Sequence, residues 1–201
     1  MKSMKIFKKL FRQENNNLIL VFGLGNPGKK HEKSRHNIGR MVLDFLEKKH
    51  GSGYQEQKKF KADISEGIIN NQKVLFAKSQ GFMNQSGIPL RAIKDYYKIK
   101  EGNIWVIQDD VDIAFGKIKS SKERGAAGHH GIESVIKHLG SNKFNRLRIG
   151  IWNRSFEEKN KEITQSYVMQ NFSEEEEKEL VEIKKSAASI IEAAIENESK
   201  R

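Results

Sequence analysis

Leu18-Ile-Leu-Val-Phe22, followed at once by Gly23-Leu-Gly-Asn-Pro-Gly28, is the stretch that decides the fold of this 201-residue chain. Five consecutive apolar residues predict a short strand that is buried on both faces, as in a parallel sheet. The glycines and the proline after it predict a tight loop. A helical pattern then begins at a capping Asn37 and ends at Gly51. The chain therefore starts with a strand, a polar loop and a helix.

The alternation of strand and helix patterns continues to the C-terminus. A hairpin is predicted with its turn at Asn70-Asn71, and a long helix is predicted to begin after a capping Ser173. Strands that alternate with helices predict a single-domain, three-layer α/β fold, whose central sheet is mixed, mostly parallel and flanked by helices. The predicted strands are 18–22, 60–69, 74–78, 104–108, 117–121 and 146–151, and the predicted helices are 37–51, 86–99, 132–139 and 173–196.

Composition excludes several classes of protein. The chain has no cysteine, which rules out disulfides, thiolate zinc sites and a cysteine nucleophile. No apolar stretch approaches the ~20 residues of a membrane span, and the N-terminus lacks the apolar core of a signal peptide, so we expect a cytoplasmic protein. We interpret residues 1–17 as a basic, mobile extension, with a membrane-surface helix as the alternative, and residues 18–201 as one domain.

The net charge of +11 is distributed unevenly along the chain. Residues 1–154 carry a net charge of +16, whereas residues 155–201 carry −5. An excess of Lys and Arg predicts a polyanionic partner, because neutralising phosphates releases counterions. Charge alone does not distinguish RNA from DNA or from a membrane surface, and a Lys-rich composition bias would give the same excess.

The glycine loop at 23–28 matches G-x-G-x-x-G directly after a strand, which is the fingerprint of a dinucleotide-binding fold. In that fold the third glycine lies in a helix packed on the sheet. Residues 29–36 offer no apolar side chain that such a helix could bury, and Asp44 and Glu47 fall inside a predicted helix rather than at the end of a second strand. We therefore interpret the loop as part of a polar site.

Four polar segments follow or flank predicted strands, namely 23–37, 81–87, 109–112 and 128–131. Segments placed in this way meet at one edge of a layered sheet. They contain His, Asp and Asn but no obvious nucleophile. A histidine with a carboxylate partner activates water near neutral pH, and amide groups stabilise an oxyanion. This set favours hydrolysis of an activated acyl group, an ester more readily than an amide.

A divalent metal is the alternative interpretation of the same residues. The candidate ligands are Asp109, Asp110, Asp112, His36, His129 and His130. Asp109 and Asp112 would face opposite sides of an extended strand, and no histidine pair has the spacing of ligands on one helix. We therefore expect no metal at this site.

The polar segments together resemble the bacterial peptidyl-tRNA hydrolase family, from Leu18 to the C-terminal helix. The motifs that carry the resemblance are Gly23-Leu-Gly-Asn-Pro-Gly28, Ser34-Arg-His-Asn-Ile-Gly39, Phe82-Met-Asn-Gln-Ser-Gly87, Asp109-Asp-Val-Asp112, Gly128-His-His-Gly131 and Phe144-Asn-Arg-Leu-Arg-Ile-Gly150. The resemblance implies a monomeric, cofactor-free esterase that cleaves the ester bond between peptide and tRNA, with tRNA as its partner. It releases both products for reuse in translation.

The resemblance also implies roles for individual residues. His36 matches the catalytic base, and Asp109 matches the acid that orients it. The residues expected to face the substrate are Asn26, Met83, Asn84, His129, His130 and His31. Arg148 matches a residue that contacts tRNA phosphates, and the expected neighbours in this role are Arg146, Lys119 and Lys122.

The chain departs from the family pattern at a few positions. The family usually has Tyr where His31 stands and Asn where His130 stands, and an imidazole replaces only one of the hydrogen bonds of an amide. Ser121 occupies a second basic phosphate position, and residues 152–155 replace a usual glycine and proline. None of these changes touches the base or its acid, so we expect hydrolysis with altered substrate affinity. A catalytically inactive RNA-binding paralogue is the alternative.

Overall fold

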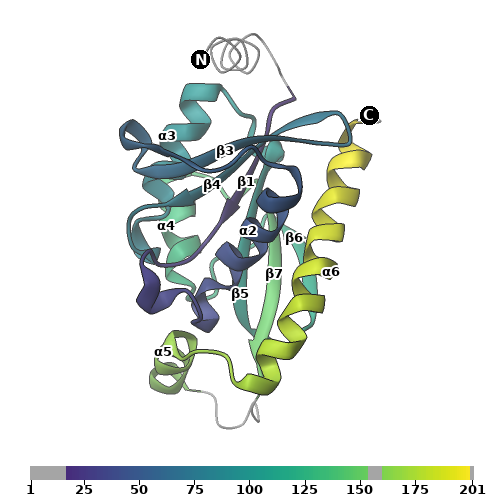
Figure 1. The fold of residues 1–201 in the computed structure, drawn as a ribbon. Coiled ribbons are helices and arrows are strands. Elements are labelled where there is room, and N and C mark those ends of the chain that lie inside the picture. The colour runs from purple at the N-terminus through teal and green to yellow at the C-terminus, as the bar shows by residue number, and fades with distance from the viewer. Residues whose placement is uncertain (1–16, 154–159, 200–201) are drawn as a thin grey trace.

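The computed structural model describes residues 17–153 and 160–199, which fold around one seven-stranded sheet (Figure 1). The strands are β1 (Ile19–Gly23), β2 (Gln55–Gln57), β3 (Ala62–Ile69), β4 (Gln72–Ser79), β5 (Ile104–Ala114), β6 (Ile118–Lys122) and β7 (Asn145–Trp152). The α-helices are α2 (Ile38–His50), α3 (Gly87–Tyr97), α4 (His130–Leu139), α5 (Lys161–Met169) and α6 (Glu174–Ser199). Short 3-10 turns are η1 (Lys29–His31), η2 (Arg35–Asn37), η3 (Lys58–Phe60), η4 (Met83–Gln85) and η5 (Glu101–Asn103).

The sheet is mixed and has a parallel centre. Its strand order is β2-β3-β4-β1-β5-β7-β6. Strand β1 pairs in parallel with β4 and β5, and β5 pairs in parallel with β7. The β3–β4 hairpin and the edge strands β2 and β6 add antiparallel pairs. The predicted α/β fold with a mixed central sheet is therefore confirmed.

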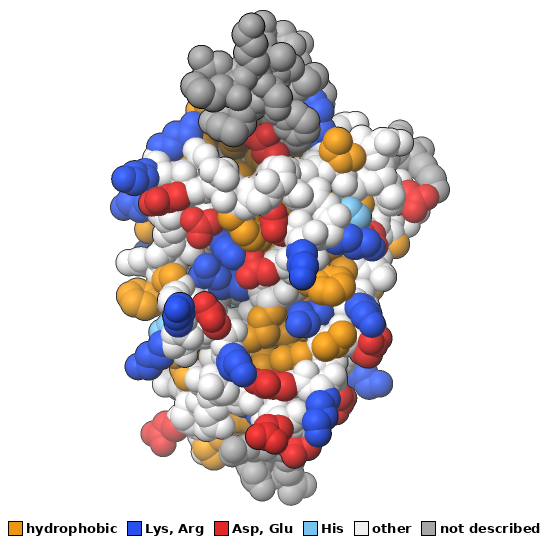
Figure 2. All heavy atoms as spheres, in the orientation of Figure 1, with side chains coloured by type: hydrophobic (Ala, Val, Ile, Leu, Met, Phe, Trp, Pro, Cys, Tyr) orange, Lys and Arg blue, Asp and Glu red, His pale blue; other side chains and the backbone are white. Residues whose placement is uncertain are grey.

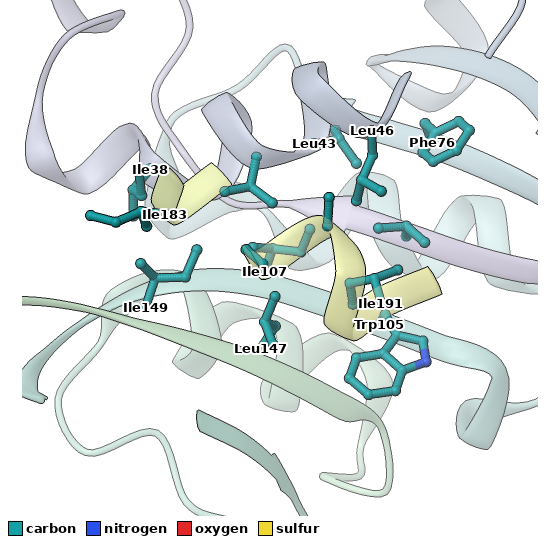
Figure 3. Close-up of a cluster of buried hydrophobic side chains, with 14 of the residues drawn as sticks. Ile38, Leu43, Leu46, Phe76, Trp105, Ile107, Leu147, Ile149, Ile183 and Ile191 are labelled. Carbon is teal, nitrogen blue, oxygen red and sulfur yellow. The ribbon is translucent and has the colours of Figure 1, made fainter. Parts of the chain in front are cut away.

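Helices cover both faces of the sheet and give it two apolar cores. Because alternate residues of a strand point to opposite faces, Trp105 and Ile107 of β5 join one core, and Ile104 and Val106 join the other. Helices α2 and α6 cover the first core (Figures 1 and 3). Helices α3 and α4 cover the second core. This is the three-layer arrangement that the sequence predicts.

Helix α2 lies very close to the centre of the sheet. A Cβ atom at Gly39 would lie 2.3 Å from the carbonyl oxygen of Ile107 and 2.7 Å from that of Leu24. Only glycine permits this approach of a helix to the backbone of two neighbouring segments. The close contact fixes the start of α2, and with it the η2 turn, against β5.

Several local predictions are corrected by the structure. Strand β5 does not end at residue 108 but continues to Ala114, so the three aspartates lie within the strand. Asn37 precedes α2 but makes no capping hydrogen bond with its side chain. Helix α5 has a weak apolar pattern, and we did not predict it. Ser173 does cap α6, since its hydroxyl accepts from the Glu176 amide while the Glu176 carboxylate accepts from the Ser173 amide.

The predicted N-terminal extension lies outside the described residues except for Asn17. No α-helix in the described ranges has the length and apolar character needed to cross a bilayer. Basic and acidic side chains are interspersed on the face of the molecule that Figure 2 shows. The positive charge of the chain is therefore not gathered into one patch on this face.

Candidate active site

His36 and Asp109 come together at the centre of the sheet. His36 lies in η2, between β1 and α2, and Asp109 lies on β5. The Nδ1 atom of His36 is 2.8 Å and 2.9 Å from the two carboxylate oxygens of Asp109. A carboxylate accepts hydrogen bonds, so Nδ1 carries the proton and Nε2 carries a lone pair. Within the described residues, Nε2 has no hydrogen-bond partner, so it is available to a water molecule.

His129 contacts the same carboxylate from the other side. Its Nδ1 atom accepts hydrogen bonds from the backbone amides of Gly131 and Ile132, at 3.1 Å and 3.3 Å, and so caps α4. These two donors keep the proton of His129 on Nε2, which lies 3.0 Å from Oδ1 of Asp109. The Asp109 carboxylate therefore accepts hydrogen bonds from two imidazole rings, whose centroids are 5.0 Å apart.

Burial and charge oppose each other in this trio. Burial lowers the pKa of His36, but the charge and hydrogen bond of Asp109 outweigh it, so the pKa of His36 is raised above 6.5. Burial raises the pKa of Asp109, but His36 and His129 hold that pKa well below its usual range. Asp109 therefore stays ionised, and its negative charge favours the protonated form of His36.

The trio also has the composition of a metal site, but its hydrogen bonds do not fit one. The candidate ligand atoms of His36, Asp109 and His129 lie within 4.8 Å of one another. The backbone amides on Nδ1 of His129 require a proton on Nε2, the atom that would have to bind the metal. A metal would have to displace this proton and leave the Nδ1 atom facing two donors. The arrangement therefore favours a hydrogen-bonded trio.

Asn26 is held rigidly beside η2 by Asn37. The side chain of Asn37 accepts from the Asn26 amide at 2.8 Å and donates to the Asn26 carbonyl at 2.9 Å. The side-chain oxygen of Asn26 accepts from the Met83 amide at 2.8 Å, which joins the glycine loop to η4. The sequence prediction missed Asn37 as part of the site. It stands next to His36 in the motif at 34–39, which was the available signal.

The remaining substrate-facing candidates are less closely joined to the trio. Met83 is buried, whereas Asn84 beside it is exposed on η4. His31 ends η1, outside the set of residues that line the cleft described below. His130 is 58% exposed, and its Nδ1 atom lies 3.1 Å from Oε2 of Glu133. The structure thus brings Asn26 and Met83 together, whereas Asn84 and His130 are exposed and His31 is half-buried.

A cleft of about 530 Å³ opens beside His36 and Asp109. Strand β5 and the residues around the start of α4 form one part of its wall, and α5 forms another. The contribution of α5 was not predicted from the sequence, because this helix is short and mostly polar. The residues that line the cleft in the described ranges are His36, Gln108, Asp109, Asp110, Val111, Asp112, Ala126, Ala127, Gly128, His129, His130, Glu133, Asn160, Thr164, Gln165 and Val168.

Two arginines on β7 have different surroundings. Arg146 is buried, and its guanidinium donates to Gln108 at 2.7 Å and to the carbonyls of Arg124 and Gly125. Its Nε and Nη1 groups thus hold Gln108 and the loop before α4, and the expected contact of Arg146 with phosphate stays a prediction. Arg148 is partly exposed, and its Nε atom donates to Asp110 at 2.6 Å. Arg148 is thus the more accessible of the two.

The two lysines of β6 do not lie on one face. Lys119 pairs with Arg148 in the register of β6 and β7, so their side chains share a face of the sheet. Lys122 is three residues further along the strand and pairs with Asn145. Strand alternation therefore directs Lys122 to the opposite face. Lys119 is therefore the lysine of β6 that lies beside Arg148.

Comparison with known proteins agrees with this geometry. The family model described as peptidyl-tRNA hydrolase matches residues 20–201. The chain belongs to this family. The chain is 26% identical to a peptidyl-tRNA hydrolase from Acinetobacter baumannii, with a TM-score of 0.84 over 94% of this chain and 93% of that one. A solved complex of a peptidyl-tRNA hydrolase with N-propanol is 26% identical, with a TM-score of 0.76 over 92% and 95% of the two chains. The activity of the protein is hydrolysis of peptidyl-tRNA.

Proposed function

We propose that His36 is the general base of peptidyl-tRNA hydrolysis. Its Nε2 atom takes a proton from water, and the resulting hydroxide attacks the carbonyl carbon of the ester between peptide and tRNA. The tetrahedral intermediate collapses, the bond to the ribose oxygen breaks, and the imidazolium of His36 returns the proton to that oxygen. The products are a tRNA hydroxyl and a peptide carboxylic acid, which releases its proton to solvent and becomes a carboxylate. The observation that carries this proposal is the contact of Nδ1 with Asp109, which leaves Nε2 as the acceptor.

Asp109 and His129 act through His36 in this proposal. Asp109 fixes the tautomer and orientation of the base and stabilises its positive charge during the reaction. His129 donates to the same carboxylate, so the carboxylate is held between two rings and cannot rotate freely. We assign both residues as positioning groups, since His36 alone directs a lone pair toward the substrate.

Side-chain amides near His36 supply donors for the oxyanion and for the substrate. The side-chain oxygen of Asn26 already accepts a hydrogen bond from the Met83 amide. The Nδ2 group of Asn26 makes only a long contact, 4.0 Å, with the Met169 sulfur, so this group is the one that can donate to the substrate. Asn84 is exposed one residue beyond Met83 and supplies a second amide. Preorganised amide donors of this kind stabilise a developing oxyanion. His31 and His130 remain proposed contacts at the edge of this region.

The tRNA phosphates are proposed to lie over Arg148 and Lys119. Burial and the positive charges of Arg148 and Arg124 lower the pKa of Arg146 to about 10, although the negative charge of Asp110 raises it. Three guanidinium groups therefore crowd one region, and a bound polyanion would relieve their repulsion. Arg146 contributes positive charge from the interior, whereas Arg148 and Lys119 make the contact. The proposed biological form is a monomer of one domain, residues 18–201, that acts in the cytoplasm with residues 1–17 as an extension.

Hydrolysis in water labelled with ¹⁸O tests this function directly. The full chain is incubated with peptidyl-tRNA, and the released peptide and tRNA are analysed by mass spectrometry. We expect one ¹⁸O atom in the peptide carboxylate and none in the tRNA, with no release above background by His36→Ala. Binding of tRNA without peptide release would instead support an inactive RNA-binding paralogue.

A further inference from the structure

A cluster of basic and aromatic side chains lies where the end of α3 meets η3. Segments 58–61 and 91–101 together carry seven Lys or Arg and two Asp or Glu, a net charge of +5. Helix α3 begins next to η4, and its eleven residues lead away from there for roughly 15 Å. Among the described residues, those that line the cleft beside His36 include none from either segment. Helices α3 and α5 lie toward opposite ends of the molecule (Figure 1), so this surface is separate from the cleft.

Tyr96 presents an aromatic ring at the centre of the cluster. It is 43% exposed, whereas Phe60 behind it is buried. Phe60 and Tyr97 each contact the Tyr96 ring edge-on, with 5.2 Å and 5.0 Å between centroids, and so hold it in one orientation. The Lys59 ammonium lies over the same ring, 3.5 Å from its centroid. Because the lysine side chain is long and flexible, a flat ligand can take its place on the ring.

Four lysines of the cluster have no acidic partner in the described parts of the chain. They are all exposed, namely Lys58, Lys61, Lys98 and Lys100. By contrast, Arg91 and Lys94 share the carboxylate of Asp95. The ammonium groups of the four lysines are therefore available to a polyanion.

Two of these lysines hold backbone positions that lysine does not favour. Lys61 follows η3 with a φ of 54°, and Lys98 follows α3 with a φ of 53°, both in the left-handed region. Glycine and asparagine adopt this conformation more readily. Backbone geometry thus does not account for lysine at either position. The property that remains is the charge of the side chain, which a ligand can use.

We propose that this surface, formed by residues 58–61 with Tyr96, Lys98 and Lys100, binds single-stranded RNA. A nucleobase stacks on the Tyr96 ring, and the lysines on both sides of the ring contact neighbouring phosphates. A base that stacks on an exposed side chain must not be paired within a duplex, so the ligand is a single strand. This contact is independent of hydrolysis at His36, because it lies at the far end of α3.

Fluorescence anisotropy of the full chain with a labelled oligouridine of about 12 nucleotides tests the proposal. We expect saturable binding at low salt. Tyr96→Ala should weaken it about five- to hundredfold, whereas Tyr96→Phe keeps the ring and should bind within about twofold of the unmodified protein. The double variant Lys61→Asn/Lys98→Asn places residues that accept a left-handed backbone, and should reduce the salt slope by about 1.4 for two lost phosphate contacts. Its hydrolysis of peptidyl-tRNA should be unchanged.

Two further double variants locate the binding site. Lys178→Asn/Lys185→Asn removes two exposed lysines from α6 and should leave the affinity for oligouridine unchanged. Arg148→Ala/Lys119→Ala removes two charges from the proposed tRNA surface and should weaken oligouridine binding less than Lys61→Asn/Lys98→Asn does. No saturable binding, or an equal loss in either of these controls, would overturn the proposal. Binding to anionic phosphatidylglycerol vesicles in place of the oligonucleotide would also overturn it.

Discussion

Arg35, the residue before His36, forms a buried ion pair with Glu176, with 2.5 Å between Nη2 and Oε2. The two side chains are only 6% and 5% exposed. The guanidinium of Arg35 also donates to the Asn171 carbonyl and lies over the ring of Tyr167, 4.4 Å from its centroid. Arg35 therefore joins η2, which carries His36, to the segment between α5 and α6. The pair thus links the segment after α5 to the turn that carries the proposed base, His36.

Removing one partner of this pair should destabilise the protein strongly. Arg35→Ala leaves a buried carboxylate without its partner, so we expect the free energy of unfolding to fall by about 3–5 kcal/mol in urea denaturation. Lys185→Ala breaks the exposed pair with Glu182 on α6 and is the control. Its cost should stay below about 1 kcal/mol. Equal costs for the two variants would contradict the assigned importance of the buried pair.

Replacing His129 should affect both stability and turnover. His129→Ala removes the cap of α4, which should cost about 0.5–2 kcal/mol of unfolding free energy. It also removes one donor to Asp109, and we expect kcat to fall about tenfold, equivalent to about 1.4 kcal/mol in the barrier. His130→Ala, at an exposed neighbour, should change the unfolding free energy by less than about 0.5 kcal/mol. Full kcat in His129→Ala would show that the second ring does not position the carboxylate.

The pH profile should report the raised pKa of His36. A general base must be deprotonated, so activity should rise with pH, and a raised pKa places the midpoint of this rise above 6.5. Asp109→Asn removes the charge that raises the pKa, so the midpoint should move to lower pH while the maximal kcat falls. Profiles of kcat/KM for the two proteins provide the measurement. An unchanged midpoint in Asp109→Asn would show that a group other than His36 controls the rise of activity with pH.

The two arginines of β7 should give different phenotypes. Arg148→Ala should weaken tRNA binding and reduce its salt slope by about one, because one phosphate contact is lost. Arg146→Ala should instead lower the free energy of unfolding, since Arg146 is buried and holds the loop before α4. Fluorescence titrations with deacylated tRNA at several salt concentrations, together with denaturation curves, separate the two effects. A change in salt slope for Arg146→Ala alone would reverse these assignments.

The α/β architecture could be predicted from the sequence, because it depends on local patterns, whereas the pairing of His36 with Asp109 was expected from the resemblance. Apolar runs identify buried strands, and the polar segments after them identify one edge of the sheet. His36 and Asp109 are 73 residues apart in the chain, yet they lie in contact as the motifs imply. The parallel centre of the sheet follows from the same alternation of strands and helices.

The features that were not predicted depend mostly on tertiary contacts. Burial of Arg146 follows from its contact with Gln108 and with the loop before α4, neither of which the pattern of β7 reveals. Asn37 has the sequence signature of a cap, but Asn26 offers its side chain two backbone partners instead. The separation of Lys119 from Lys122 is different, because strand alternation alone predicts it, and a role of both lysines in binding tRNA stays a prediction.

Turnover and tRNA affinity of His36→Asn, measured together, decide whether His36 is the general base. The claim is that His36 transfers the proton and contributes little to binding. We predict that kcat falls by about 10²- to 10⁴-fold, as for loss of a general base, while the Kd for deacylated tRNA stays within about twofold of the unmodified protein. A His36→Asn protein that keeps most of its kcat, or that loses activity only through a weaker Kd, would contradict the account.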